Sequence, residues 1–105
     1  PDQALGEKHS VFAPFFNIQT ATIAATARLA KAPNTVVIPY FFIRTDKGYT
    51  MNFDAPLTNY PSDDAIDDAT KTNQILHDQI LKAPEQYLWI HKRFKTRPKG
   101  ETSFY

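Results

Sequence analysis

Three histidines are the residues of this 105-residue chain best suited to proton transfer, and none of them has the partner that such chemistry needs. His9 is followed by SVFAP, His77 by DQILK and His91 by KRFKT, so no acid stands five positions after any of them. His77 neighbours Asp78, but adjacent residues of a helix are not expected to face each other. We therefore expect His77 on a helix surface and predict no self-sufficient acid–base site in the chain.

The sequence also lacks the residue patterns of several common catalytic and cofactor sites. It has no cysteine, which excludes a disulfide framework, a zinc thiolate site and a thiol nucleophile. Its three glycines stand far apart and form no phosphate-binding loop, and no serine lies in a nucleophile elbow. Neither a cofactor nor a metal ion is predicted. Four clustered acids are expected to interact with a helix dipole instead: Asp63, Asp64, Asp67 and Asp68.

The strongest sign of a binding function is the charge at the C-terminal end. Residues 84–105 carry five cations and two acids, a net charge of +3, whereas the rest of the chain carries −2. In the stretch APEQYLWIHKRFKTRPKG, Trp89 and Phe94 are expected to anchor the segment while cations project from it. This mixture suits a lipid headgroup surface or single-stranded nucleic acid, and its competing interpretation is a solvated tail. The projecting cations are Arg93, Lys95 and Arg97.

The elements that must position these residues predict a single α/β domain over residues 1–105. Hydrophobic residues make up 42% of the chain and charged residues 22%, as in a globular protein. No apolar run approaches the roughly 18 residues of a membrane span. The expected elements are an extended segment over 9–17, an Ala/Thr-rich helix over 18–32, a buried strand over 35–44, a strand over 49–53, a helix capped by Ser62, and a short helix from Pro84.

The order strand, helix, strand gives a right-handed crossover if the two strands are parallel, within a predicted partial mixed sheet flanked by helices. The strand TVVIPYFFIR is apolar on both faces and needs neighbours on each side, which three extended segments do not supply. We therefore expect an open sheet edge and exposed apolar surface, as in part of a larger sheet.

Several blocks of the sequence resemble the late acyltransferases of lipid A biosynthesis, the lauroyl and myristoyl transferases. APEQYLWIHKRFKTRPKG, with the trailing SFY, resembles their C-terminal signature. PDQALGEKHSVFAPFFNIQTAT resembles a central block of the form PDxDxGxxxxVFVPFFGxxTAT. VVIPYFFIRTDKGY and the NYPSDD connection also resemble the family in order and spacing, so the resemblance spans the whole chain. It implies the C-terminal part of a glycerolipid-acyltransferase-like fold.

The resemblance implies an enzyme that moves a fatty acyl chain from acyl carrier protein to a hydroxyl of a lipid A precursor. It implies the cytoplasmic face of the inner membrane of a Gram-negative bacterium. The family's catalytic H-x4-D/E pair precedes its PDxD block, so the resemblance places the base in an upstream half and no catalytic residue in this chain. The implied partners are acyl carrier protein, the lipid A precursor, the membrane surface and that upstream half, with no nucleic acid and no cofactor. Implied substrate contacts are Asp2, Lys8, Arg93, Lys95 and Arg97, and implied acyl-channel residues are Phe12, Phe15, Phe16 and Phe41.

Two positions depart from the family pattern. Ala4 stands where PDxD has its second acid, which leaves a degenerate relative as one alternative. Asn17 replaces the glycine of PFFG, a mild change because asparagine accepts a left-handed turn. Another alternative is a non-enzymatic basic and aromatic module that binds anionic lipid headgroups or nucleic acid. For each aromatic candidate, core packing is the competing role.

Overall fold

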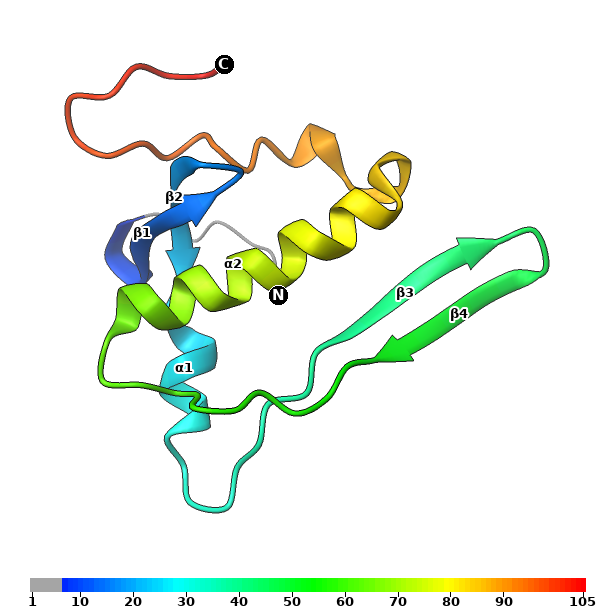
Figure 1. Ribbon diagram of the computed structural model, residues 1–105. Coiled ribbons are helices and arrows are strands. Elements are labelled where there is room, and N and C mark those ends of the chain that lie inside the picture. Colours follow the sequence, from blue (N-terminus) through cyan, green and yellow to red (C-terminus); the bar gives the residue numbers. More distant parts are fainter. Residues whose placement is uncertain (1–6) are drawn as a thin grey trace.

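The computed structural model describes residues 7–105, which form two small antiparallel sheets beside helices (Figure 1). The α/β class predicted from the sequence is confirmed. In chain order the elements are β1 (Ser10–Phe15), β2 (Ile18–Ile23), α1 (Ala25–Ala30), β3 (Tyr40–Thr45), β4 (Gly48–Phe53) and α2 (Ala65–Lys82), with short 3-10 turns at Glu7–His9, Pro84–Gln86 and Trp89–His91. Within this range no helix is both long and apolar enough to cross a membrane.

Strands β1 and β2 form a tight hairpin in which Phe15 is paired with Ile18 across a two-residue turn. The turn residues, Phe16 and Asn17, both have positive φ angles, 49° and 60°. Two residues with positive φ give a turn the twist that matches paired strands. Asn17 therefore does take the left-handed conformation expected of it.

Residues 18–32, predicted to form one smooth helix, are divided between β2 and α1. Four of the six residues of β2 are β-branched, and such stiff side chains favour a strand where a partner is available: Ile18, Thr20, Thr22 and Ile23. Strand β1 supplies a partner for every position of β2. The helix prediction is therefore wrong for residues 18–24, and only Ala25–Ala30 is α-helical.

Strands β3 and β4 form a second antiparallel hairpin, closed at Gly48, whose φ of 124° requires glycine. The strand predicted over 49–53 is confirmed within β4. The buried strand predicted over 35–44 is wrong in its extent, because β3 begins only at Tyr40, after Pro39, and several of its side chains are exposed. Each sheet of the described chain has two antiparallel strands, so the predicted parallel crossover is also wrong.

Helix α2 begins at a cap made by Asp64. One carboxylate oxygen of Asp64 accepts hydrogen bonds from the backbone N–H groups of Ile66, at 2.9 Å, and Asp67, at 3.2 Å. The prediction that Ser62 is the cap is wrong, because its hydroxyl oxygen accepts from the backbone N–H of Asp64, at 3.1 Å, and not from the first turn of the helix. The backbone N–H of Ser62 donates to the buried carboxylate of Asp68, at 2.9 Å. The clustered acids thus stabilise the helix start, as their position in the sequence predicts.

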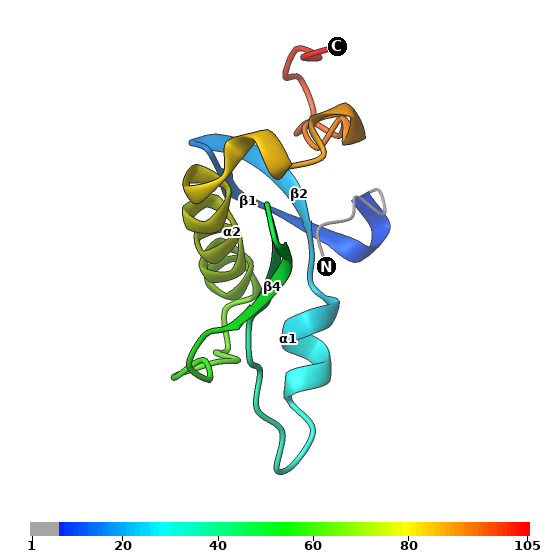
Figure 2. The same cartoon turned by 90° about the vertical axis from the view of Figure 1, so that its right-hand side faces the viewer.

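Helix α2 packs against β1 and buries Ala69, Asn73 and Ile80 along its inner face. These three are spaced four and seven positions apart and lie on one side of the helix, whereas Ile66, in the first turn, is exposed. The β3–β4 hairpin extends away from the body that α2 forms with the first hairpin, as Figure 1 shows from the side and Figure 2 nearly end-on.

One face of the β3–β4 hairpin is apolar and uncovered in the described chain. Successive side chains of a strand point to opposite faces, so the pairing of Tyr40 with Phe53 and of Phe42 with Met51 gathers all four on one face. Tyr49 continues this face, and the five side chains are between 44% and 75% exposed. Monomeric proteins rarely expose so continuous an apolar surface. We call these five residues the hairpin face.

The hairpin face generates a prediction about association. We expect the chain to self-associate and to bind a hydrophobic dye at micromolar concentration. The double substitution Phe42→Lys and Met51→Glu places an opposite-charge pair at one cross-strand position and should restore a monomer without opening the hairpin. Thr50→Lys, on the other face of β4, is the matched control and should leave association unchanged. Sedimentation velocity distinguishes these outcomes, and a monodisperse wild-type chain without dye binding would contradict the prediction.

Tyr60 generates a prediction about pH. Burial, and secondarily the nearby Asp68 carboxylate, raise the pKa of the Tyr60 phenol above its usual value. A group whose pKa is raised by folding stabilises the fold below its unfolded pKa, and this contribution is lost as the pH rises through the folded pKa. We expect the wild-type chain to lose more unfolding free energy than Tyr60→Phe between about pH 8 and pH 11. Urea denaturation at the two pH values measures the difference, and equal losses in both proteins would refute it.

Candidate functional site

The C-terminal segment, residues 84–105, crosses the free edge of β2. The carbonyls of Gln19 and Ala21 stand two positions apart on this strand, so both point to the same edge. Arg93 donates to the Ala21 carbonyl oxygen at 2.6 Å, and Arg97 donates to that of Gln19 at 2.6 Å. Two arginine side chains therefore occupy the place that a third strand would take beside β2.

A similar contact joins the C-terminal segment to the second hairpin. The side-chain amide of Gln86 accepts a hydrogen bond from the backbone N–H of Arg44 at 2.8 Å and donates one to the backbone carbonyl oxygen of Arg44 at 3.0 Å. This pair of bonds reproduces the pattern that a neighbouring strand would make along β3. The C-terminal segment thus holds one edge of each hairpin through side chains.

Arg93 is an interior residue, with only 4% of its surface exposed. Besides the Ala21 carbonyl it bonds the Thr22 hydroxyl oxygen at 3.3 Å, and its guanidinium lies 5.3 Å from the centre of the Phe15 ring. The expectation that Arg93 projects from the surface is therefore wrong. A buried guanidinium is stable only where hydrogen bonds satisfy it, and the strand edge supplies them.

The other two predicted cations differ from each other. Arg97 has a largely buried side chain that pairs with Glu101 and lies over the Phe104 ring, so the expectation that it projects is wrong as well. Lys95 is exposed, as predicted. Of the three cations expected to meet an anionic partner, only Lys95 therefore presents its charge to the surface.

A buried polar cluster connects this segment to helix α2. The side-chain amide of Asn73 donates to the Thr22 hydroxyl oxygen at 2.8 Å and to the Pro14 carbonyl oxygen at 3.1 Å. Thr22 also receives the bond from Arg93, so α2, β2 and the C-terminal segment meet at one hydroxyl, and β1 joins them through the Pro14 carbonyl that bonds Asn73. The sequence signal for this cluster is the polar Asn73 within the apolar stripe of a helix.

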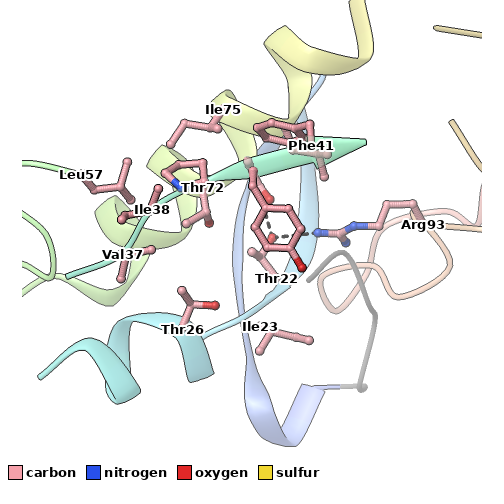
Figure 3. A pocket seen from close by; sticks show the side chains of 14 residues that line it. Thr22, Ile23, Thr26, Val37, Ile38, Phe41, Leu57, Thr72, Ile75 and Arg93 are labelled. Carbon is pink, nitrogen blue, oxygen red and sulfur yellow. Dashed lines mark hydrogen bonds between the residues drawn. The ribbon is translucent and has the colours of Figure 1, made fainter. Parts of the chain in front are cut away.

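A cavity of about 430 Å³ lies between helix α2, strand β2 and the start of β3. Figure 3 shows Arg93 reaching it beside Thr22, while Val37, Ile38 and Leu57 lie on the opposite side. Asn73 also lines the cavity. The polar groups of the cavity wall therefore belong to the cluster around Thr22, and most of the remaining wall is apolar. The cavity has the amphipathic character that small-ligand sites share.

The four phenylalanines predicted to line an acyl channel do not lie together. Phe41 lines this cavity. Phe15 is buried and stacks on Phe94, with ring centres 5.7 Å apart. Phe15 and Phe16 border a separate, smaller hollow of about 270 Å³. Phe12 is half-buried in β1. Sequence reasoning missed most of the cavity wall, because Val37, Leu57 and their neighbours come from segments far apart in the chain.

Two other predicted contacts lie away from this cavity. Lys8 is exposed in the 3-10 turn at Glu7–His9, which precedes β1. Asp2, like the departure at Ala4, lies outside the described residues. In residues 7–105 no group of three or more potential ligands is arranged to hold a metal ion.

His77 does contact its neighbour, contrary to the sequence expectation. Its ring nitrogen Nδ1 lies 3.0 Å from a carboxylate oxygen of Asp78, which also accepts a bond from Gln74 at 2.8 Å. The hydrogen bonds from His77 and then from Gln74 lower the pKa of the Asp78 carboxyl. Asp78 is exposed, whereas the His77 ring is partly buried and packs edge-on against the Phe16 ring, with ring centres 4.4 Å apart. The pair therefore lies at the margin between α2 and the first hairpin.

Comparison with known proteins assigns the family. The family described as bacterial lipid A biosynthesis acyltransferase matches residues 1–96. The chain belongs to this family. The match includes both hairpins, helix α2 and the part of the C-terminal segment that carries Gln86 and Arg93, whereas Arg97 lies one residue beyond it.

The relatives in this family differ in their acyl groups. The chain is 41% identical to a lipid A biosynthesis palmitoleoyltransferase of Escherichia coli K12 over its whole length, and 40% identical to the lauroyltransferase of that organism. It is 36% identical to the corresponding myristoyltransferase. The matched region makes up 35%, 35% and 33% of these proteins, respectively. The chain therefore spans about a third of the length of the curated relatives it matches.

The edge contacts generate a prediction about stability. Arg93→Ala removes a charged donor and leaves the Ala21 carbonyl and the Thr22 hydroxyl without that partner. We expect a loss of about 1.5–3 kcal/mol in the free energy of unfolding. Lys95→Ala, a change in the same segment at an exposed site, is the control and should cost less than about 0.5 kcal/mol. Urea denaturation provides both values, and equal effects of the two changes would contradict the structural role of Arg93.

Proposed function

We propose that this chain is part of an enzyme that transfers a fatty acyl group from acyl carrier protein to a hydroxyl of a lipid A precursor, in lipopolysaccharide biosynthesis. The observation that carries the proposal is the family match over residues 1–96, together with relatives named for acyl transfer in lipid A biosynthesis. The chain spans only about a third of those relatives, so the activity belongs to a protein of their length.

In this proposal the chain supplies binding and positioning rather than the base. A hydroxyl acceptor needs a general base within hydrogen-bond reach. None of the three histidines has an acid at the H-x4-D/E spacing, so the base is proposed to come from a part of the enzyme outside this chain. The cavity beside Arg93 is large enough to take an acyl chain, and Phe41 and the other apolar side chains around it offer an apolar surface for one.

We place the enzyme at the cytoplasmic face of the inner membrane of a Gram-negative bacterium, where an acceptor with lipid anchors and the soluble acyl carrier protein can meet. Exposed cations of the C-terminal segment support contact with anionic headgroups, since each contributes about 1 kcal/mol near such a surface. These cations are Lys92, Lys95 and Lys99.

The non-enzymatic binding module is less well supported than the sequence alone indicates. Its main argument is the cluster of projecting cations near the C-terminus. Arg93 and Arg97 instead bond strand carbonyls, which removes two of the charges that such a module would present.

Grafting tests the proposed function. We replace the matching third of the E. coli lauroyltransferase with residues 1–105 and assay acyl transfer from acyl carrier protein to a lipid A precursor. The chimera should transfer acyl groups at least tenfold above a chimera that carries a scrambled graft, and residues 1–105 alone should show no turnover. A folded chimera with no transfer would refute the proposal, and turnover by residues 1–105 alone would overturn the placement of the base outside them.

A further inference from the structure

The cavity between α2, β2 and the start of β3 has a polar side and an apolar side that match the two ends of a fatty acyl chain. We infer that an acyl chain binds there with its oxygen-bearing end at Arg93 and Thr22, and that the wall formed by Val37, Ile38 and Leu57 limits the length accepted. This inference rests on the proposed function for the identity of the ligand. It deepens that function by assigning the selection of chain length to named residues.

The size of the cavity suits this ligand. Its volume of about 430 Å³ lies within the roughly 300–1,000 Å³ of pockets that bind small molecules. Side chains from β2, α1, residues 37–41, Leu57, α2 and Arg93 line it, it is partly open to solvent, and carbon dominates the lining. An apolar ligand gains free energy there in proportion to the surface it removes from water.

The polar side fixes the direction in which the ligand lies. Arg93 and Asn73 are both almost completely buried, and both bond the hydroxyl oxygen of Thr22. Their position on one side of a mostly apolar cavity favours a ligand whose single polar end lies against them, because a polar end placed against the apolar wall would lose its hydrogen bonds to water. The carbonyl of an acyl thioester or the carboxylate of a fatty acid meets this requirement.

The wall opposite Arg93 is held by a backbone hydrogen bond, which gives it a defined position against the far end of an acyl chain. The backbone N–H of Leu57 donates to the carbonyl oxygen of Val37 at 2.9 Å, which continues the pairing of the second hairpin into this region. Figure 3 shows Val37, Ile38 and Leu57 together on the side away from Arg93. Because each methylene in an apolar pocket contributes a factor of roughly ten or more to discrimination, a larger or smaller side chain on this wall changes the preferred ligand.

Binding of fatty acids to residues 1–105 that carry Phe42→Lys and Met51→Glu tests the inference without using catalysis, because the wild-type hairpin face is itself expected to bind a hydrophobic probe. Decanoate, dodecanoate, tetradecanoate and hexadecanoate compete for the chain with parinaric acid, a fluorescent fatty acid. Leu57→Phe should weaken hexadecanoate relative to dodecanoate by about tenfold, and Leu57→Ala should shift the preference toward the longer acid. Leu29→Phe is the control, because Leu29 is exposed on α1 and does not line the cavity; it should leave the order unchanged.

The polar side is tested with an altered ligand, which avoids unfolding the chain. Dodecanol should bind about tenfold more weakly than dodecanoate, because it loses a charge-assisted hydrogen bond. Equal affinities for acid and alcohol would overturn the assignment of the polar end. A preference for chain length that neither Leu57 variant changes, or no displacement of parinaric acid by any fatty acid, would overturn the assignment of the wall.

Failure of the inference and failure of the proposed function give different results. If the grafted chimera transfers acyl groups while the Leu57 variants leave both the binding series and the chimera's acyl preference unchanged, the function stands and the inference fails. If Leu57 governs fatty-acid selectivity but the folded chimera transfers nothing, the binding site stands and the proposed function fails.

Discussion

Hydrogen bonds from Arg93 and Arg97 to the carbonyls of Ala21 and Gln19 are the interaction on which the described structure depends. The first sheet has only two strands, so the outer edge of β2 presents carbonyls that need donors. Burying a guanidinium carries a large desolvation penalty. Arg93 is stable in the interior only because the Ala21 carbonyl and the Thr22 hydroxyl accept hydrogen bonds from it. The guanidinium thus satisfies a carbonyl at the edge of β2, and that carbonyl in turn offsets the desolvation of the guanidinium.

The remaining parts are arranged around this contact. Asn73 reaches the same Thr22 hydroxyl from α2, so helix, hairpin and C-terminal segment are held at one point, which is also the polar side of the cavity. Through the side chain of Gln86, the same C-terminal segment also bonds the backbone of Arg44 at the edge of β3. The described residues measure 46 × 39 × 19 Å, a thin body with an uncovered hairpin face. Such a shape agrees with a chain that spans about a third of its relatives, since a thin body leaves apolar groups for further structure to cover.

Features that depend on neighbouring residues could be predicted from the sequence, and features that depend on distant partners could not. The acids before α2, the strand over 49–53 and the turn at Asn17 follow from local preferences. The helix prediction over 18–24 failed because Ala and Thr fit either state, and the choice came from pairing with β1. Arg93 was recognisable as part of a family signature, but sequence order does not reveal the Ala21 carbonyl that buries it. The cavity was only partly predicted, through Phe41, because its walls come from five separate segments.

Native-state hydrogen exchange of the wild-type chain and of Arg93→Ala tests most directly whether the C-terminal segment holds the first hairpin. In the wild type, the amides of β2 and those of His91 and Lys95, which bond the Leu88 and Lys92 carbonyls, should open with similar free energies, as parts of one cooperative unit. In Arg93→Ala, protection of both groups should fall together. The account would be contradicted if the C-terminal amides exchanged freely in the wild type, or if Arg93→Ala released them while β2 kept its full protection.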